Sequence, residues 1–130
     1  MFINKFYKFV ACGFLCTLAL IPAIAHAQVA TVICAGTVAE LGIHSPGKVY
    51  VRLNSMNVGV MICSMDSEWG IAGTQYGNTS VSTCKALYAT LLAAKVAQTP
   101  IQAMYIDGNV PSTCSGFLPW SPVSVRFTDF

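Results

Sequence analysis

Apolar and polar residues alternate over much of this chain, and this pattern predicts strands. Residues 48–53 alternate strictly, which is typical of a strand with one buried face. The β-rich apolar stretch 31–43 precedes this strand, with Gly36 as an expected bend, and residues 58–63 follow it. Turn residues at 44–47 and 54–57 separate the three, so the pattern predicts an antiparallel meander.

A helical pattern follows, in which apolar residues recur at spacings of three and four. Ser82 is the expected N-cap, and Pro100 is expected to stop the helix. The expected core-facing stripe comprises Cys84, Leu87, Tyr88, Leu91, Leu92, Lys95 and Val96. A second, alanine-rich face would allow close packing of another helix: Ala86, Ala89, Ala93 and Ala97.

Two further strands are expected after the helix, at residues 101–107 and 123–127. The chain is thus predicted to be mainly β with one helix between strands three and four. This order matches an OB-fold, a partly open five-stranded antiparallel barrel. Residues 28–130 are long enough for one such domain.

Residues 1–27 have the pattern of an export signal. Lys5 and Lys8 precede an apolar stretch, and Ala25-His26-Ala27 supplies a small-x-small cleavage site. A retained membrane anchor is the less favoured alternative, because the apolar stretch is interrupted by Pro22 just before this site. We therefore expect a secreted or periplasmic protein that has no membrane span after cleavage.

The expected mature chain carries few charges, and they balance. Residues 28–130 contain five Lys and Arg residues and five Asp and Glu residues, so their net charge is near zero. This balance argues against a nucleic-acid-binding surface and against a polybasic membrane-binding surface. A surface with so few charges is either rich in neutral polar residues or in contact with other subunits.

Four cysteines remain after the export signal: Cys34, Cys63, Cys84 and Cys114. An even number in a short exported chain predicts two disulfides, which allow three pairings. We expect Cys63–Cys114 with Cys34–Cys84. A zinc site is the alternative, but the chain has no C-x2-C pair, and His44 is the only histidine after the signal. No metal or other cofactor is expected.

The long segment 64–81 is the candidate binding loop, because it combines glycines with aromatic and short polar side chains. Flat aromatic rings cover the C–H faces of sugars, and short polar side chains reach their hydroxyl groups. The candidate glycan-binding residues are Asp66, Glu68, Trp69, Gln75, Tyr76 and Asn78. The alternative for Trp69 is that its ring folds back over the core.

The sequence does not favour an enzyme. A catalytic triad would need His44, which lies in a His-Ser-Pro-Gly turn, and the cysteines are expected to be oxidised. Glycoside hydrolysis by a pair among Asp66, Glu68 and Asp107 is the remaining catalytic alternative.

Three stretches of this chain resemble the B subunits of subtilase cytotoxin and related pertussis-like toxins. They are residues 37–43 followed by His44-Ser45-Pro46, residues 59–65, and residues 84–97 with the strand 101–107. The resemblance implies OB-fold subunits in a homopentameric ring that binds sialylated cell-surface glycans, delivers a separate catalytic A subunit and contributes to virulence. The serine of the family's glycan pocket is missing here, since that position falls near Cys34-Ala35.

A different class of function remains open beside this one. The chain would then be a stand-alone secreted or periplasmic OB-fold protein, such as an inhibitor or an envelope accessory factor, without a toxin partner.

Overall fold

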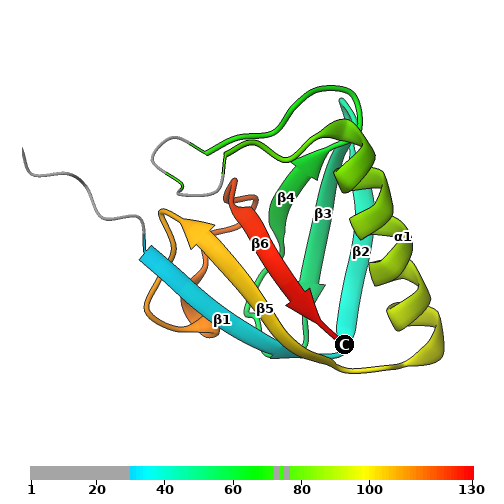
Figure 1. Ribbon diagram of the computed structural model, residues 1–130. Helices are drawn as coiled ribbons and strands as arrows, with labels where there is room; N and C mark the ends of the chain where they lie inside the picture. Colours follow the sequence, from blue (N-terminus) through cyan, green and yellow to red (C-terminus); the bar gives the residue numbers. More distant parts are fainter. Residues whose placement is uncertain (1–29, 72–73, 75–76) are drawn as a thin grey trace, which may run out of the picture.

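The computed structural model describes residues 30–71, 74 and 77–130. The expected export signal, residues 1–27, lies outside these described residues. The elements follow one another along the chain as β1 (Ala30–Gly36), β2 (Val38–His44), β3 (Lys48–Leu53), β4 (Val60–Ser64), α1 (Val81–Ala97), β5 (Ile101–Gly108), the 3-10 helix η1 (Cys114–Gly116) and β6 (Ser124–Asp129) (Figure 1).

The strands form two antiparallel three-stranded sheets, with orders β1-β5-β6 and β2-β3-β4. Figure 1 shows α1 lying beside the second sheet, next to β2. The prediction of a mainly β chain with one helix after the meander is confirmed. Within the described residues the sheets do not close into one barrel, and there are more strands than the five expected.

The extra strand arises because the expected strand over residues 31–43 is divided in two. Gly36 has a φ of 128°, and the pairing of β1 with β5 shifts register between Cys34 and Gly36. Only glycine adopts such a φ without strain, so the chain bends at the expected position. After Thr37 the chain continues as β2, which pairs with β3 instead of β5.

The core is a single cluster of buried side chains to which both sheets and α1 contribute. In β3 the strict alternation predicted from the sequence is confirmed, because Val49, Val51 and Leu53 are fully buried. The largest other fully buried side chains are Ile62, Leu91, Ile101, Met104 and Ile106. Burial of this kind supplies most of the free energy that holds the two sheets together.

The helix begins two residues earlier than expected. Ser80, and not Ser82, is the N-cap, and its hydroxyl accepts a hydrogen bond from the backbone N–H of Thr83 at 3.2 Å. At the other end Gln98 takes a left-handed conformation with a φ of 54°. The helix therefore ends before Pro100, which the sequence had pointed to as its stop.

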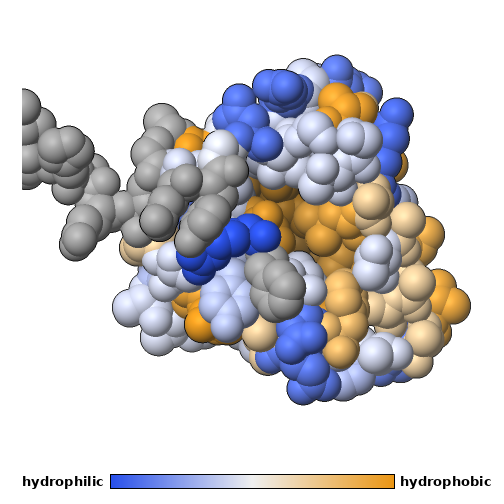
Figure 2. Space-filling model, viewed as in Figure 1, coloured by the Kyte–Doolittle hydropathy of each residue, from blue (hydrophilic) through white to orange (hydrophobic). Residues whose placement is uncertain are grey.

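The buried stripe of α1 is narrower than predicted. Only Cys84, Leu91 and Ala94 are buried, whereas Leu92 is 42% and Val96 is 79% exposed. The reason is that α1 packs chiefly on β2 and β4, so that a small part of its circumference meets the core. Figure 2 shows apolar residues gathered on the side of the molecule where α1 lies.

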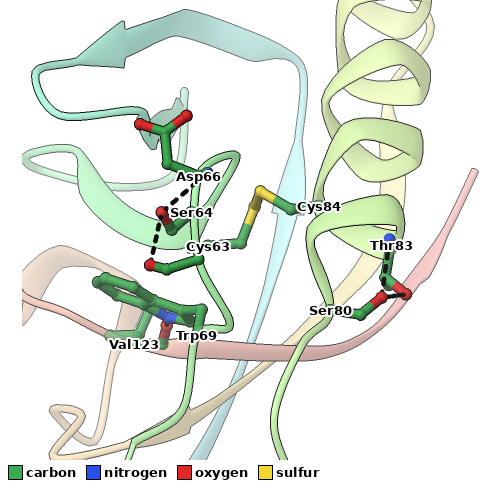
Figure 3. The surroundings of a disulfide bond; sticks show 9 residues. Cys63, Ser64, Asp66, Trp69, Ser80, Thr83, Cys84 and Val123 are labelled. Carbon is green, nitrogen blue, oxygen red and sulfur yellow. Dashed lines mark hydrogen bonds between the residues drawn. A yellow bond between two sulfur atoms is a disulfide. The ribbon is translucent and has the colours of Figure 1, made fainter.

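The two disulfides are present, but the expected pairing was wrong. The structure joins Cys34 to Cys114 and Cys63 to Cys84, with Cα–Cα distances of 5.7 and 5.6 Å. Figure 3 shows the second bond crossing from the end of β4 to the first turns of α1. The first bond ties η1 to β1. Disulfides of this kind fit an extracellular or periplasmic protein.

Candidate functional site

The predicted binding loop lies between β4 and α1, and one short contact organises it. Trp69 and Thr79 exchange two backbone hydrogen bonds, of 3.0 and 2.7 Å. This isolated bridge closes the loop at its base. The predicted site residues Gln75 and Tyr76 fall outside the described residues.

Trp69 is part of the core, so it is not the exposed stacking platform that we considered. Trp69 is only 8% exposed, and its indole Nε1–H donates to the carbonyl of Val123 at 2.8 Å (Figure 3). The Lys48 ammonium lies 4.4 Å from the centre of the ring, as in a cation–π contact. A sugar therefore cannot reach the face of this indole without a rearrangement of the core.

The other described residues of the predicted site are exposed but only partly brought together. The Asn78 side-chain amide donates to Glu68 at 3.4 Å, so these two residues are neighbours. Asp66 instead lies against Gly47, in the turn between β2 and β3. Its backbone N–H donates to the hydroxyl of Ser64 at 3.3 Å. The loop thus offers polar groups, but its described residues place no exposed aromatic ring beside them.

Asp107, one of the three carboxylates considered for glycoside hydrolysis, is buried. Asp107 lies in β5 with its residue 4% exposed, and it accepts a hydrogen bond from Thr31. Arg126 lies 3.5 Å from the same carboxylate. Asp107 is therefore buried and held by Thr31 and Arg126, whereas Asp66 and Glu68 are exposed.

Three aromatic side chains meet elsewhere, on the outer face of the β2-β3-β4 sheet. The ring of Trp120 lies 4.7 Å from that of Tyr50 and 5.0 Å from that of His44, measured between centroids. Trp120 is 48% exposed, and His44 is exposed as well. We refer to His44, Tyr50 and Trp120 as the aromatic surface. Exposed tryptophan and tyrosine side chains in such a cluster are typical of recognition sites.

The backbone holds Trp120 in a conformation that few non-glycine residues adopt. Its φ is 63°, and its N–H donates to the carbonyl of Gly59 at 3.2 Å. A side chain at Gly59 would collide with the ring of Tyr50, so this glycine allows the ring to lie close to the backbone. Strain of this kind persists where the surroundings fix the conformation, and it is often found at functional sites.

A carboxylate and a guanidinium lie next to the aromatic surface. Glu40 accepts hydrogen bonds from Arg52 Nε at 2.9 Å and from the Tyr50 hydroxyl at 3.0 Å. The bond from Arg52, and then that from Tyr50, holds the pKa of Glu40 below its ordinary value. Burial, and then the bond to Glu40, raises the pKa of Tyr50. At neutral pH Glu40 is therefore ionised and Tyr50 remains the donor.

Sequence reasoning missed the aromatic surface for a definite reason. The alternation of β3 places Tyr50 on the outer face, and this signal was present. Trp120, however, comes from the irregular segment before β6, and no local pattern relates it to Tyr50, 70 positions earlier. The contact is made because this segment runs alongside β4. The backbone N–H of Met61 donates to the carbonyl of Ser121, and that of Val123 donates to the carbonyl of Met61.

A separate hollow lies between α1 and β6, where Figure 2 shows an apolar floor. Its volume is about 250 Å³. It is lined by Thr79, Thr83, Leu87, Thr90, Val125, Arg126, Thr128 and Phe130. None of the predicted glycan-binding residues that the structure describes is among them.

The described ranges contain neither a metal-binding cluster nor a membrane-spanning helix. Residues 30–71, 74 and 77–130 contain no group of three His, Cys, Asp or Glu residues arranged to hold a metal ion. Over the same part of the chain, no helix is both long enough and apolar enough to span a membrane.

No family model, curated protein or solved structure matches this chain.

Proposed function

We propose that this protein is an exported, non-catalytic binding subunit that recognises cell-surface glycans. The observation that carries the proposal is the aromatic surface, where a half-exposed Trp120 lies against Tyr50 and His44. Rings of this kind cover the C–H faces of a pyranose, and the neighbouring Glu40 and Arg52 supply an acceptor and donors for hydroxyl groups. The disulfides support an extracellular or periplasmic place of action.

The fold that we propose is an opened OB-fold. This proposal is supported by the continuation of β1 into β2 after a single residue, because the two strands belong to different sheets and so link them at one side. At the other side, Met61 of β4 and Pro122 form an isolated parallel bridge. Both features join sheet edges that a barrel would have to close.

We further propose that the subunit assembles with copies of itself through the outer side of α1. Exposed residues with small or apolar side chains follow one another at spacings of three and four: Ala86, Ala89, Ala93 and Val96. This spacing is that of a helix–helix seam, and alanine allows close approach of the backbones. Because the chain resembles toxin B subunits, we expect the assembly to be a homopentamer that carries a catalytic A subunit.

The recognition proposal is tested by replacing the exposed indole. Trp120→Ala is expected to weaken glycan binding about tenfold or more, because the ring supplies stacking area that no neighbour replaces. Binding of the exported wild-type protein and the variant is compared on a glycan array and then by titration. Leu118→Ala is the matched control, since Leu118 is 73% exposed in the same segment.

We expect the free energy of unfolding of both variants to lie within about 0.5 kcal/mol of the wild-type value, because the substituted side chains lie at the surface. A wild-type protein that binds no glycan on the array would refute the proposal. Equal loss of binding in Leu118→Ala and Trp120→Ala would show that the segment, and not the indole, makes the contact.

The assembly proposal is tested by placing a charge on the exposed helix face. We expect the wild type to have a native mass that is a multiple of the chain mass, and Val96→Asp to reduce it to that of the monomer. The measurement is light scattering after size exclusion, with Ser112→Asp as the control, because it adds the same charge at an exposed position outside α1. A wild-type monomer at high concentration would exclude the ring and favour a stand-alone secreted protein.

A further inference from the structure

The outer face of β2 and β3 brings three pairs of residues side by side. In the register of these strands Glu40 lies opposite Arg52, Gly42 opposite Tyr50, and His44 opposite Lys48. Residues directly opposite one another project to the same face of a sheet. Gly42 therefore lies in the middle of this face, between the ion pair and the aromatic surface.

Gly42 leaves open space at the centre of this face. A β-carbon built on Gly42 would meet no atom within 4 Å, although Tyr50 is its neighbour across the strands. The backbone of Gly42 does not require a glycine, since its φ lies outside the left-handed region. The missing side chain thus has no conformational explanation, and its effect is to leave room beside Tyr50.

The polar side of this space offers an acceptor and donors together. Arg52 Nη2 lies 2.7 Å from Glu40 Oε1, and both side chains are partly exposed. Two adjacent hydroxyl groups of a sugar match such a pair, because each hydroxyl both donates and accepts. Hydrogen bonds from Arg52 and Tyr50 hold the Glu40 carboxylate in place, so little ordering is needed on binding.

The charges of this face favour a neutral ligand. The positive charge of Arg52 is compensated by Glu40, and an anionic sugar would bring a second carboxylate near that of Glu40. Two further ammonium groups lie nearby and are already engaged: that of Lys48 lies over the ring of the buried Trp69, 4.4 Å from its centre, and that of Lys95 donates to the carbonyl of Ala39 at 2.6 Å.

We infer that this face binds a neutral hexopyranose. The apolar face of the sugar would lie against the aromatic surface, a ring edge would occupy the space at Gly42, and two adjacent hydroxyl groups would bond to Glu40 and Arg52. The inference rests on the proposed function, because it names the class of glycan and the place where it binds. It differs from the sialylated glycans that the toxin resemblance implies.

The experiment compares neutral and sialylated probes on the same protein. The probes are lactose, cellobiose and maltose on one side, and 3′-sialyllactose and 6′-sialyllactose on the other. Binding to the exported full chain is measured by ligand-observed NMR and by calorimetric titration. We expect at least one neutral disaccharide to bind, and sialylation not to improve binding.

Two variants locate the site. Gly42→Leu is expected to abolish binding by filling the space, and Glu40→Gln to weaken it about tenfold by removing a charged acceptor. Ile43→Leu is the matched control, because Ile43 is the next residue of β2 and projects to the other face. The melting temperature of each variant is measured alongside, and we expect all three to remain folded.

The possible failures are distinguishable. Binding of the sialylated probes alone would overturn the neutral-sugar inference and leave glycan recognition intact. Neutral-sugar binding that survives in folded Gly42→Leu would place the site elsewhere and also overturn it. Absence of binding to these probes and to every glycan on an array would refute the proposed function itself.

Discussion

Loss of the Cys34–Cys114 disulfide is expected to lower the free energy of unfolding by about 4.5 kcal/mol, and loss of Cys63–Cys84 by about 3 kcal/mol. The difference follows from the separations along the chain, which are 80 and 21 residues. A crosslink that closes a longer loop removes more conformational freedom from the unfolded chain. Both values are large beside the total stability of a small domain, so we expect either loss to reduce export yield.

The measurement separates the crosslink from the packing of its sulfur atoms. Each pair is replaced by alanine, and the one disulfide that remains is then compared in its oxidised and reduced forms by urea denaturation. This comparison leaves every side chain in place except for the bond itself. Equal effects of the two disulfides, or a larger effect of Cys63–Cys84, would contradict the loop-length argument.

Trp69→Ala is expected to lower the free energy of unfolding by about 3–5 kcal/mol, the usual cost of truncating a buried aromatic side chain. The variant also removes the hydrogen bond from the indole to the carbonyl of Val123, which links the binding loop to the segment before β6. Trp69→Phe keeps most of the ring but not this donor, and should cost about 1–3 kcal/mol. Denaturant titration followed by circular dichroism measures both variants.

Trp120→Ala serves as the control for this prediction, since it removes an indole that is half-exposed. The two tryptophans should give opposite results: Trp69 should affect stability, and Trp120 should affect glycan binding. A Trp69→Ala protein that keeps wild-type stability but loses glycan binding would return Trp69 to the site and contradict its assignment to the core.

Much of the secondary structure could be predicted because it depends on neighbours in the sequence. The alternation in β3 and the helical spacing of α1 each report which residues share a face. The bend at Gly36 was also visible, since a glycine within an apolar stretch marks such a position. Its consequence was not visible, because the change of strand partner depends on β3 and β5, which come later in the chain.

The candidate site was predicted less well than the fold. Composition favoured the loop 64–81 as the binding site. In the structure, however, Trp69 of this loop is buried, whereas Asp66 and Glu68 are exposed. Composition reports which side chains are available but not which of them face the solvent. The aromatic surface instead combines β2, β3 and the segment before β6, and its residues share no local motif.

The sequence by itself determined the kind of protein: a charge-poor, mainly β chain with one helix and enough cysteines for two disulfides. Only the tertiary structure decided which cysteines pair and which tryptophan is exposed. The physical reason is the same in both cases. Cys114 meets Cys34, and Trp120 meets Tyr50, through contacts between segments that are distant in the sequence. Such contacts are chosen by the packing of the whole core, to which every strand contributes.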